Sequence, residues 1–286
     1  MNLPAVDRIV NALLYEGYIL YPYRASSVKN RLRFNFGVVY PKAYAEAQSG
    51  NDACSMQTQC LVNGGESLEI CVRFLRLIET DRDGWQEAVE CRVDLPKCPL
   101  TSITRDFSEG GISGTVEVLA EPVRENVTRI TVRIANTTNS SGTATRDAAL
   151  AHSLISAHTI LGIDGGEFVS LLEPPDDLAN AAAECRNIGT WPVLVGERGD
   201  KTTLLSSPIV LYDYPAIAPE SPGDLFDATE IDEILTLRVL TMTEQEKMEA
   251  RATDPRARRI LDRAESLNED QLAALHGTFR TAGGSS

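Results

Sequence analysis

Alternating apolar and polar positions mark the first half of the chain as β-rich. Over residues 67–78, apolar side chains at nearly every second position alternate with polar ones, and residues 85–95 repeat this pattern. Asp83-Gly84 between them is a typical turn dipeptide, so the two segments predict an antiparallel hairpin. Further strands are predicted at residues 18–21, 34–40, 56–62, 112–123 and 127–137.

The second half mixes short apolar runs with helix signals. A loop rich in Ser, Thr, Gly and Asn at residues 136–145 separates the halves. Residues 147–156 then predict a helix that runs into a strand at 157–163. Short strands are expected at 168–172, 191–195 and 208–211, and a helix at 178–185. Glycine pairs are expected at hairpin turns at 64–65, 110–111 and 165–166.

Helix signals also stand near both ends. Apolar residues at helical spacing within residues 6–14 predict an amphipathic helix. Thr243 and Glu246 have the spacing of a capping box, and Asp254 followed by Pro255 is a typical helix start. The C-terminal part is therefore expected to be helical.

Together the patterns predict an α+β protein with a mainly antiparallel, β-sandwich-like body and a helical C-terminal tail. Residues 1–140 are expected to form a short helix and an antiparallel β domain. Residues 141–242 are expected to form a mixed α/β segment packed on that domain, and residues 243–286 the tail.

Composition narrows the function classes. The formal net charge of −14 disfavours nucleic-acid binding, because attraction to phosphates needs a positive field. Neither an export signal nor an apolar run of membrane-spanning length is found, so we expect a cytoplasmic protein without a membrane partner. Its six cysteines are expected to be reduced thiols, and no cofactor is predicted.

One segment departs from this acidic balance. Residues 15–44 hold six of the eight tyrosines, and no Asp or Glu occurs between Gly17 and Ala45. Tyrosine and arginine offer flat surfaces with polar ends, so they often anchor protein contacts. The anchors expected in this tyrosine–arginine belt are Tyr21, Tyr23, Arg24, Arg31 and Arg33.

Two other interpretations of the belt stay open. The tyrosines could pack in the interior as part of buried strands. They could also stack on single-stranded RNA beside the arginines, although the acidic remainder of the chain disfavours this.

A second candidate surface follows Tyr212 and Tyr214. Six carboxylates fall within 14 residues there, without Lys or Arg among them. The side chains expected to form this surface are Tyr214, Glu220, Asp224 and Asp227. Helix capping with a solvated face, or a cation site, would also account for the carboxylates. The belt and this acidic loop could dock on each other within one chain, or between two self-associating copies.

The histidines allow an enzymatic alternative. His152 and His158 lie six positions apart and, with nearby carboxylates, could serve a metal-dependent hydrolase or maturation enzyme. No spacing rule supplies a third ligand, however. The chain also lacks a Gly-x-Ser-x-Gly nucleophile turn and a glycine-rich phosphate loop, so a non-enzymatic protein is favoured.

Several long motifs resemble a known group of proteins. They are LYEGYILYPYR at residues 14–24, FGVVYP at 36–41, WPVLVG at 191–196 and the segment 205–237. On these motifs the chain resembles conserved uncharacterised proteins encoded beside nickel–iron hydrogenases of the actinobacterial type, over most of its length. The resemblance implies an accessory role in assembling or maturing the hydrogenase. It implies a hydrogenase subunit or another maturation factor as the partner, and it carries over no catalytic residue.

Overall fold

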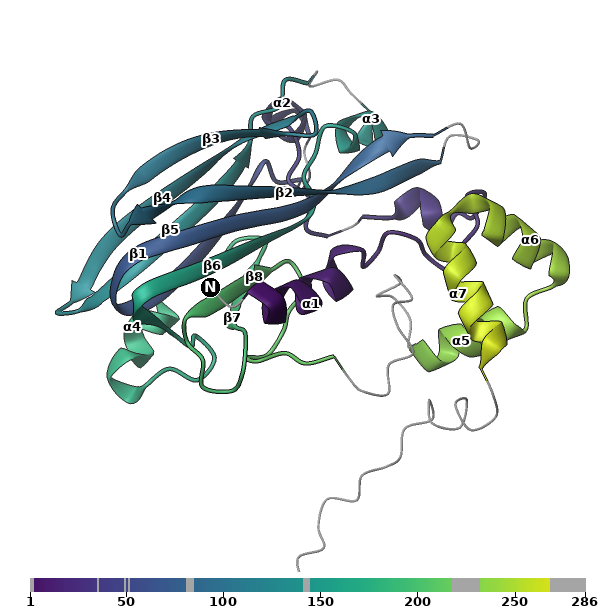
Figure 1. Cartoon of the computed structure of the whole chain (residues 1–286). Coiled ribbons are helices and arrows are strands. Elements are labelled where there is room, and N and C mark those ends of the chain that lie inside the picture. The colour runs from purple at the N-terminus through teal and green to yellow at the C-terminus, as the bar shows by residue number, and fades with distance from the viewer. Residues whose placement is uncertain are drawn as a thin grey trace, which may run out of the picture. The chain divides into compact units, whose positions relative to one another are not determined.

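The protein is described from a computed structural model, drawn in Figure 1. The structure describes residues 3–34, 36–48, 50, 52–80, 85–140, 145–217 and 232–267. They belong to two compact units. The larger unit comprises Met1–Tyr15, Phe34–Thr80 and Gln86–Ala216, and the smaller comprises Glu16–Arg33, Asp81–Trp85 and Ile217–Ser286. These units are defined by contacts and each combines separate stretches of the chain. The division into residues 1–140, 141–242 and 243–286 therefore stays a prediction.

The larger unit holds the strands. They are β1 (Ser55–Glu79), β2 (Gln86–Pro99), β3 (Ile103–Glu109), β4 (Ile112–Arg124), β5 (Val127–Asn136), β6 (Ile155–Val169), β7 (Trp191–Leu194) and β8 (Thr203–Ser207). Its helices are α1 (Leu3–Leu14), α2 (Lys42–Ala47), α3 (Arg146–Leu150), the 3₁₀ turn η2 (Asp176–Leu178) and α4 (Ala179–Ala183). The smaller unit holds the 3₁₀ turn η1 (Lys29–Leu32), α5 (Asp232–Leu240), α6 (Glu244–Thr253) and α7 (Pro255–Ser266).

The strands form one antiparallel sheet in the order β3-β4-β5-β1-β6-β8-β7, with β2 also paired to β1. The long strand β1 is its axis: residues 55–63 pair with β5, residues 67–79 with β2, and residues 61–75 with β6. The predicted antiparallel α+β class is thus confirmed. The predicted hairpin of residues 67–78 and 85–95 is present as β1–β2, and the predicted strands 112–123 and 127–137 pair as β4–β5.

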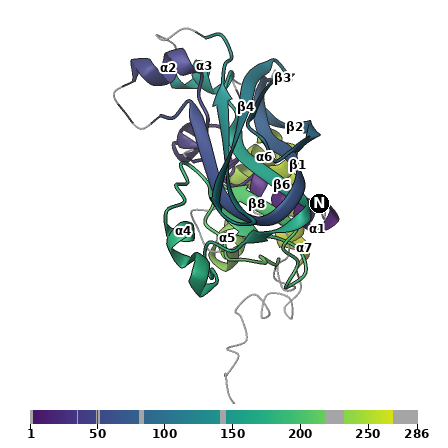
Figure 2. The same cartoon turned by 90° about the vertical axis from the view of Figure 1, so that its left-hand side faces the viewer.

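The curvature of the sheet, visible in Figure 2, gives the body its two-layer packing. The rings of Phe74 on β1 and Phe107 on β3 lie 6.4 Å apart, although β3 pairs only with β4. A side chain at Gly110, in the β3–β4 turn, would lie 3.0 Å from the sulfur of Cys91 on β2. The β3–β4 hairpin therefore covers the β1–β2 hairpin across a shared apolar core.

Helix α1 packs against the sheet through its apolar face. Val6, Val10 and Leu14 are fully buried at helical spacing. On the same helix, Asp7 accepts a 3.0 Å hydrogen bond from Arg73 of β1, whose side chain is only 4% exposed. The predicted N-terminal helix is therefore confirmed, and it covers a buried charge.

The C-terminal helix signals are confirmed as well. Thr243 and Glu246 form the reciprocal capping box that begins α6. Asp254 caps α7 by accepting a 2.7 Å hydrogen bond from the backbone N–H of Arg256, with Pro255 in the first turn. None of the described helices combines the length and the apolar composition needed to cross a membrane.

Strand predictions at three segments are wrong, and the strand expected at 168–172 is only the end of β6, at Val169. Residues 18–21 form turns, and within residues 34–40 the only described ladder contact is a single bridge between Val39 and Leu154. The strand expected at 208–211 ends earlier, because β8 closes at Ser207. Each segment carries or borders a proline, which cannot donate to a ladder. Strand β3 was not predicted, because its polar sequence shows no clear alternation.

Two of the glycine pairs are not turns. Only Gly110-Gly111 joins a hairpin, whereas residues 64–65 lie inside β1 and residues 165–166 inside β6. Gly64 pairs with Gly166 across the two strands. A side chain at Gly166 would lie 2.5 Å from the backbone nitrogen of Gly65. These glycines thus permit close approach of two backbones instead of chain reversal.

Candidate functional site

The tyrosine–arginine belt is divided between the two units and is mostly interior. Tyr18 and Tyr23 are fully buried in the smaller unit. Tyr40 and Tyr44, each 4% exposed, belong to the larger unit. Interior packing, one of the open interpretations, therefore accounts for most of these tyrosines, although they do not lie in strands.

Asp254 organises the buried part of the belt. Its carboxylate accepts hydrogen bonds from the phenol of Tyr18 at 2.5 Å and from the indole of Trp85 at 3.1 Å. The guanidinium of Arg33 stacks 3.9 Å from the centroid of the Trp85 ring, and Arg33 is only 8% exposed. Arg33 and Tyr23, expected as partner anchors, are thus structural residues of the smaller unit in this conformation.

The other belt anchors also contact their own unit. Arg24 forms ion pairs with Glu246 at 3.7 Å and Glu249 at 3.3 Å, both on α6. The guanidinium of Arg238 lies 5.6 Å from the ring centroid of Tyr21. These partly exposed side chains tie the belt to α5 and α6. Arg31 lies in η1, and its side chain is outside the described residues.

The second candidate surface is only partly described. Glu220, Asp224 and Asp227 lie outside the described residues. Tyr214 is half-buried and packs against the main apolar core. Its neighbour Tyr212 is 86% exposed instead. The exposed aromatic side chain of this segment is therefore Tyr212, whereas Tyr214 was the one expected.

Tyr212 lies in the segment that follows β8 and borders β7, the last strand in the sheet order. The backbone nitrogen of Leu194 on β7 donates to the Asp213 carboxylate at 2.8 Å, and that of Tyr214 donates to the Leu194 carbonyl at 2.7 Å. The segment before Pro215 thus runs along β7. The large exposed side chains of β7 and of this segment are called here the β7-edge surface. They are Trp191 (46%) on β7, and Val210 (69%) and Tyr212 (86%) on the segment.

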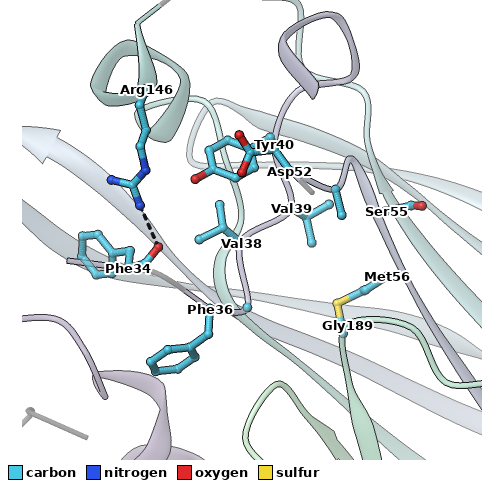
Figure 3. Close-up of a pocket in the computed structure, with 12 residues that line it drawn as sticks. Phe34, Phe36, Val38, Val39, Tyr40, Asp52, Ser55, Met56, Arg146 and Gly189 are labelled. Carbon is cyan, nitrogen blue, oxygen red and sulfur yellow. Dashed lines mark hydrogen bonds between the residues drawn. The ribbon is translucent and has the colours of Figure 1, made fainter. Parts of the chain in front are cut away.

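A pocket of about 270 Å³ lies elsewhere in the larger unit. Four segments line it: residues 34 and 36–40, residues 52–56 at the entry to β1, the first residue of α3, and Gly189 before β7. Figure 3 shows Arg146, Tyr40 and Asp52 toward one side, with Phe36 and Met56 toward the other. The pocket therefore has a polar end and an apolar end, the usual composition of a small-molecule site.

The backbone around the pocket is held by local hydrogen bonds. Val39 exchanges backbone bonds of 2.8 and 3.1 Å with Leu154, and the Asn136 amide donates to the Val39 carbonyl at 2.9 Å. Arg146 donates a 3.0 Å bond to the carbonyl of Phe34, a non-glycine residue with a φ of 60°. Such left-handed residues cost free energy, and they concentrate at functional sites.

The polar end of the pocket carries both signs of charge. Burial raises the pKa of Tyr40 above its usual range, while the nearby charge of Arg146 lowers it and that of Asp52 raises it. Burial also raises the pKa of Tyr44, and the negative charge of Asp52 raises it to a smaller extent. Both phenols are thus protonated donors at neutral pH. The Tyr44 phenol also shares a side-chain hydrogen bond with the Asp52 carboxylate.

The histidines do not form a metal site with the described residues. His158 is fully buried on β6, and its Nδ1 lies 2.7 Å from the carbonyl of Ser156. Burial, with a smaller effect from the charge of Arg73 on the paired strand, lowers its pKa to about 4. His152 is exposed. Among the described residues, no group of three histidine, cysteine or acidic side chains could hold a metal ion.

The six cysteines are free thiols. Cys71 and Cys91 lie on the paired strands β1 and β2, but Cys71 is opposite Asp94 while Cys91 is opposite Phe74. Because residues 71 and 74 point to opposite faces of a strand, the two sulfurs do not meet. Burial raises the pKa of Cys71 to about 12, so this thiol is protonated and unreactive at neutral pH.

No family model matches the chain, and no curated protein matches it.

Sequence reasoning missed the pocket and the β7-edge surface. Asp52 and Arg146 flank unremarkable loop segments, and no spacing rule joins positions 94 residues apart. The motifs FGVVYP and WPVLVG were noted for their resemblance, and they contribute to the pocket wall and to β7. These motifs and the aromatic pair Tyr212 and Tyr214 were the sequence signals that pointed to these places.

Proposed function

We propose that this chain is a non-enzymatic, cytoplasmic accessory protein that binds a nickel–iron hydrogenase subunit, or another maturation factor, through the β7-edge surface. The hydrogenase partner is inferred from the resemblance of the sequence motifs. The β7-edge surface is inferred as the contact from the exposure of its large apolar side chains.

The observation that carries the proposal is the exposure of Tyr212, at 86%, beside β7. Trp191 on β7 is the other large aromatic in this place, and it is 46% exposed. Tyrosine and tryptophan dominate the binding free energy of protein interfaces, because they bury a large area at a small entropic cost. Two of them on one sheet edge, with Val210, fit a protein contact better than solvated surface.

The resemblance supports the same place. WPVLVG forms β7, and the long motif that begins at Leu205 runs through β8 and Tyr212. Two motifs that are separate in the sequence therefore meet at the proposed surface. The acidic residues Glu220, Asp224 and Asp227 follow in the same motif and remain proposed contacts.

The test is capture of purified hydrogenase subunits by the tagged protein. We expect the wild-type chain to retain a subunit, and the double variant Trp191→Ala, Tyr212→Ala to weaken retention about tenfold or more. Val123→Ala is the matched control, because Val123 is exposed at the far end of β4. The proposal fails if the wild-type chain retains no subunit, or if the double variant binds as the control does.

A further inference from the structure

We propose that the pocket between residues 34–40, the start of β1 and Arg146 binds a free α-amino acid with a bulky apolar side chain. This site is independent of the proposed protein contact, because its polar end and its lining residues lie outside the β7-edge surface.

The charges at the polar end select the head group. Arg146 carries a positive charge and Asp52 a negative charge, and both act on the Tyr40 phenol between them. A carboxylate is attracted to the guanidinium, and an ammonium group to the carboxylate of Asp52. A zwitterion satisfies both, whereas a ligand with one charge is repelled by the group of like sign.

The opposite end selects the side chain. Phe36 and Met56 line it with apolar surface. A volume of about 270 Å³ is small for a ligand pocket and suits a ligand of amino-acid size. Burial of an apolar side chain there supplies free energy that glycine or alanine could not.

The pocket wall is fixed before any ligand arrives. A side chain at Gly37 would lie 2.7 Å from the ring of Pro208 and 3.3 Å from the Cα of Ser156, so this strip is tightly packed. Phe34 and Ser156 both hold a positive φ, at 60° and 50°. Phe34 lines the cavity and Ser156 lies behind Gly37, and such strained residues are typical of a preorganised site.

The test is a titration of the full chain with three ligands that differ only in the head group. They are phenylalanine, N-acetylphenylalanine, which lacks the ammonium group, and phenylalaninamide, which lacks the carboxylate. We expect phenylalanine to bind with a dissociation constant in the millimolar range or below. We expect each analogue to bind about tenfold more weakly or worse, which is one lost charge contact.

Two variants assign the charges. Asp52→Asn is expected to weaken phenylalanine and phenylalaninamide but not N-acetylphenylalanine. Arg146→Gln is expected to weaken phenylalanine and N-acetylphenylalanine but not phenylalaninamide. Asp106→Asn and Arg105→Gln are the matched controls, because both side chains are exposed on β3.

Arg146 also donates a hydrogen bond to the Phe34 carbonyl, so its loss could disturb the fold. Circular dichroism of each variant tests for this, and Arg146→Lys, which keeps the charge, separates the effect of the charge from that of the hydrogen bond. The wild-type titration is decisive by itself. Absence of binding at millimolar phenylalanine, or equal binding of the three ligands, would overturn the assignment.

Discussion

The phenol of Tyr18 donates a 2.5 Å hydrogen bond to the carboxylate of Asp254, a residue 236 positions further along the chain. The same carboxylate caps α7 and accepts from the indole of Trp85. One buried acidic side chain, 1% exposed, thus joins three separate segments of the smaller unit.

Asp254→Ala is expected to lower the free energy of unfolding of the smaller unit by about 3 kcal/mol. The loss of a helix cap costs about 1 kcal/mol, and two buried donors left unpaired cost more. Urea denaturation monitored by tryptophan fluorescence would measure the change. Asp262→Ala is the control, because its ion pair with Arg251 is exposed and should contribute less than about 1 kcal/mol. Equal effects of the two variants would show that Asp254 is not an organising residue.

His158 is expected to make stability depend on pH. Burial lowers the pKa of His158 to about 4, against about 6.5 in the unfolded chain. Above pH 6.5 the imidazole is neutral in both the folded and the unfolded state. The free energy of unfolding is therefore not reduced by protonation of His158 there. As the pH falls from 6.5 toward 4, only the unfolded state takes up the proton, and the free energy of unfolding drops by an amount on the order of 3 kcal/mol.

The measurement is urea denaturation at pH 7 and pH 4.5 for the wild type and His158→Gln. The difference between the two proteins isolates the histidine from other titrating groups. His152→Gln serves as the control, since His152 is exposed and should leave the pH dependence unchanged. A wild-type pH dependence that survives in His158→Gln would contradict the prediction.

Gly166→Ala should be severely destabilising. The added carbon would lie 2.5 Å from the nitrogen of Gly65 and 2.8 Å from the carbonyl oxygen of Asn63, and both are backbone atoms that cannot rotate away. We expect a loss of about 3 kcal/mol, at the upper end for overpacking, or failure to fold. Gly50→Ala is the matched control, because nothing lies within 4 Å of its added carbon. Thermal denaturation would separate them, and similar melting temperatures would refute the close approach of β1 and β6.

Truncation of Tyr214 should lower the stability of the protein, whereas truncation of Tyr212 should leave it nearly unchanged. Tyr214→Ala is expected to lower the free energy of unfolding by about 2 kcal/mol, because its ring packs against the core. Tyr212→Ala should change it by less than about 0.5 kcal/mol, because its ring is solvated. In subunit capture, Tyr212→Ala should lose binding at unchanged stability. A large stability loss in Tyr212→Ala would place its ring in the interior.

Local pattern predicted much of the fold. The β1–β2 and β4–β5 hairpins follow from period-two alternation and turn dipeptides, which act between neighbouring residues. The starts of α6 and α7 follow from Thr243, Glu246 and Asp254, because a cap needs only a side chain and a backbone group three residues away. The helix α1 follows from apolar spacing.

The same reasoning misplaced the tyrosines. Tyr18 was expected in a strand and Tyr23 at a partner surface, with interior packing of the belt left open. In the structure Tyr18 is buried because Asp254 and Trp85 surround it. Which polar side chain is buried depends on a partner that can lie anywhere in the chain, and composition does not name it.

By itself, the sequence determined the antiparallel α+β class, the hairpins and the capped helices, since short-range sterics and hydrogen bonds decide them. Only the tertiary structure decided that Tyr212 is exposed while Tyr214 is packed, and that Asp52 and Arg146 face one pocket. These depend on segments far apart in the chain, and their meeting is set by the curvature of the sheet and the packing of its core.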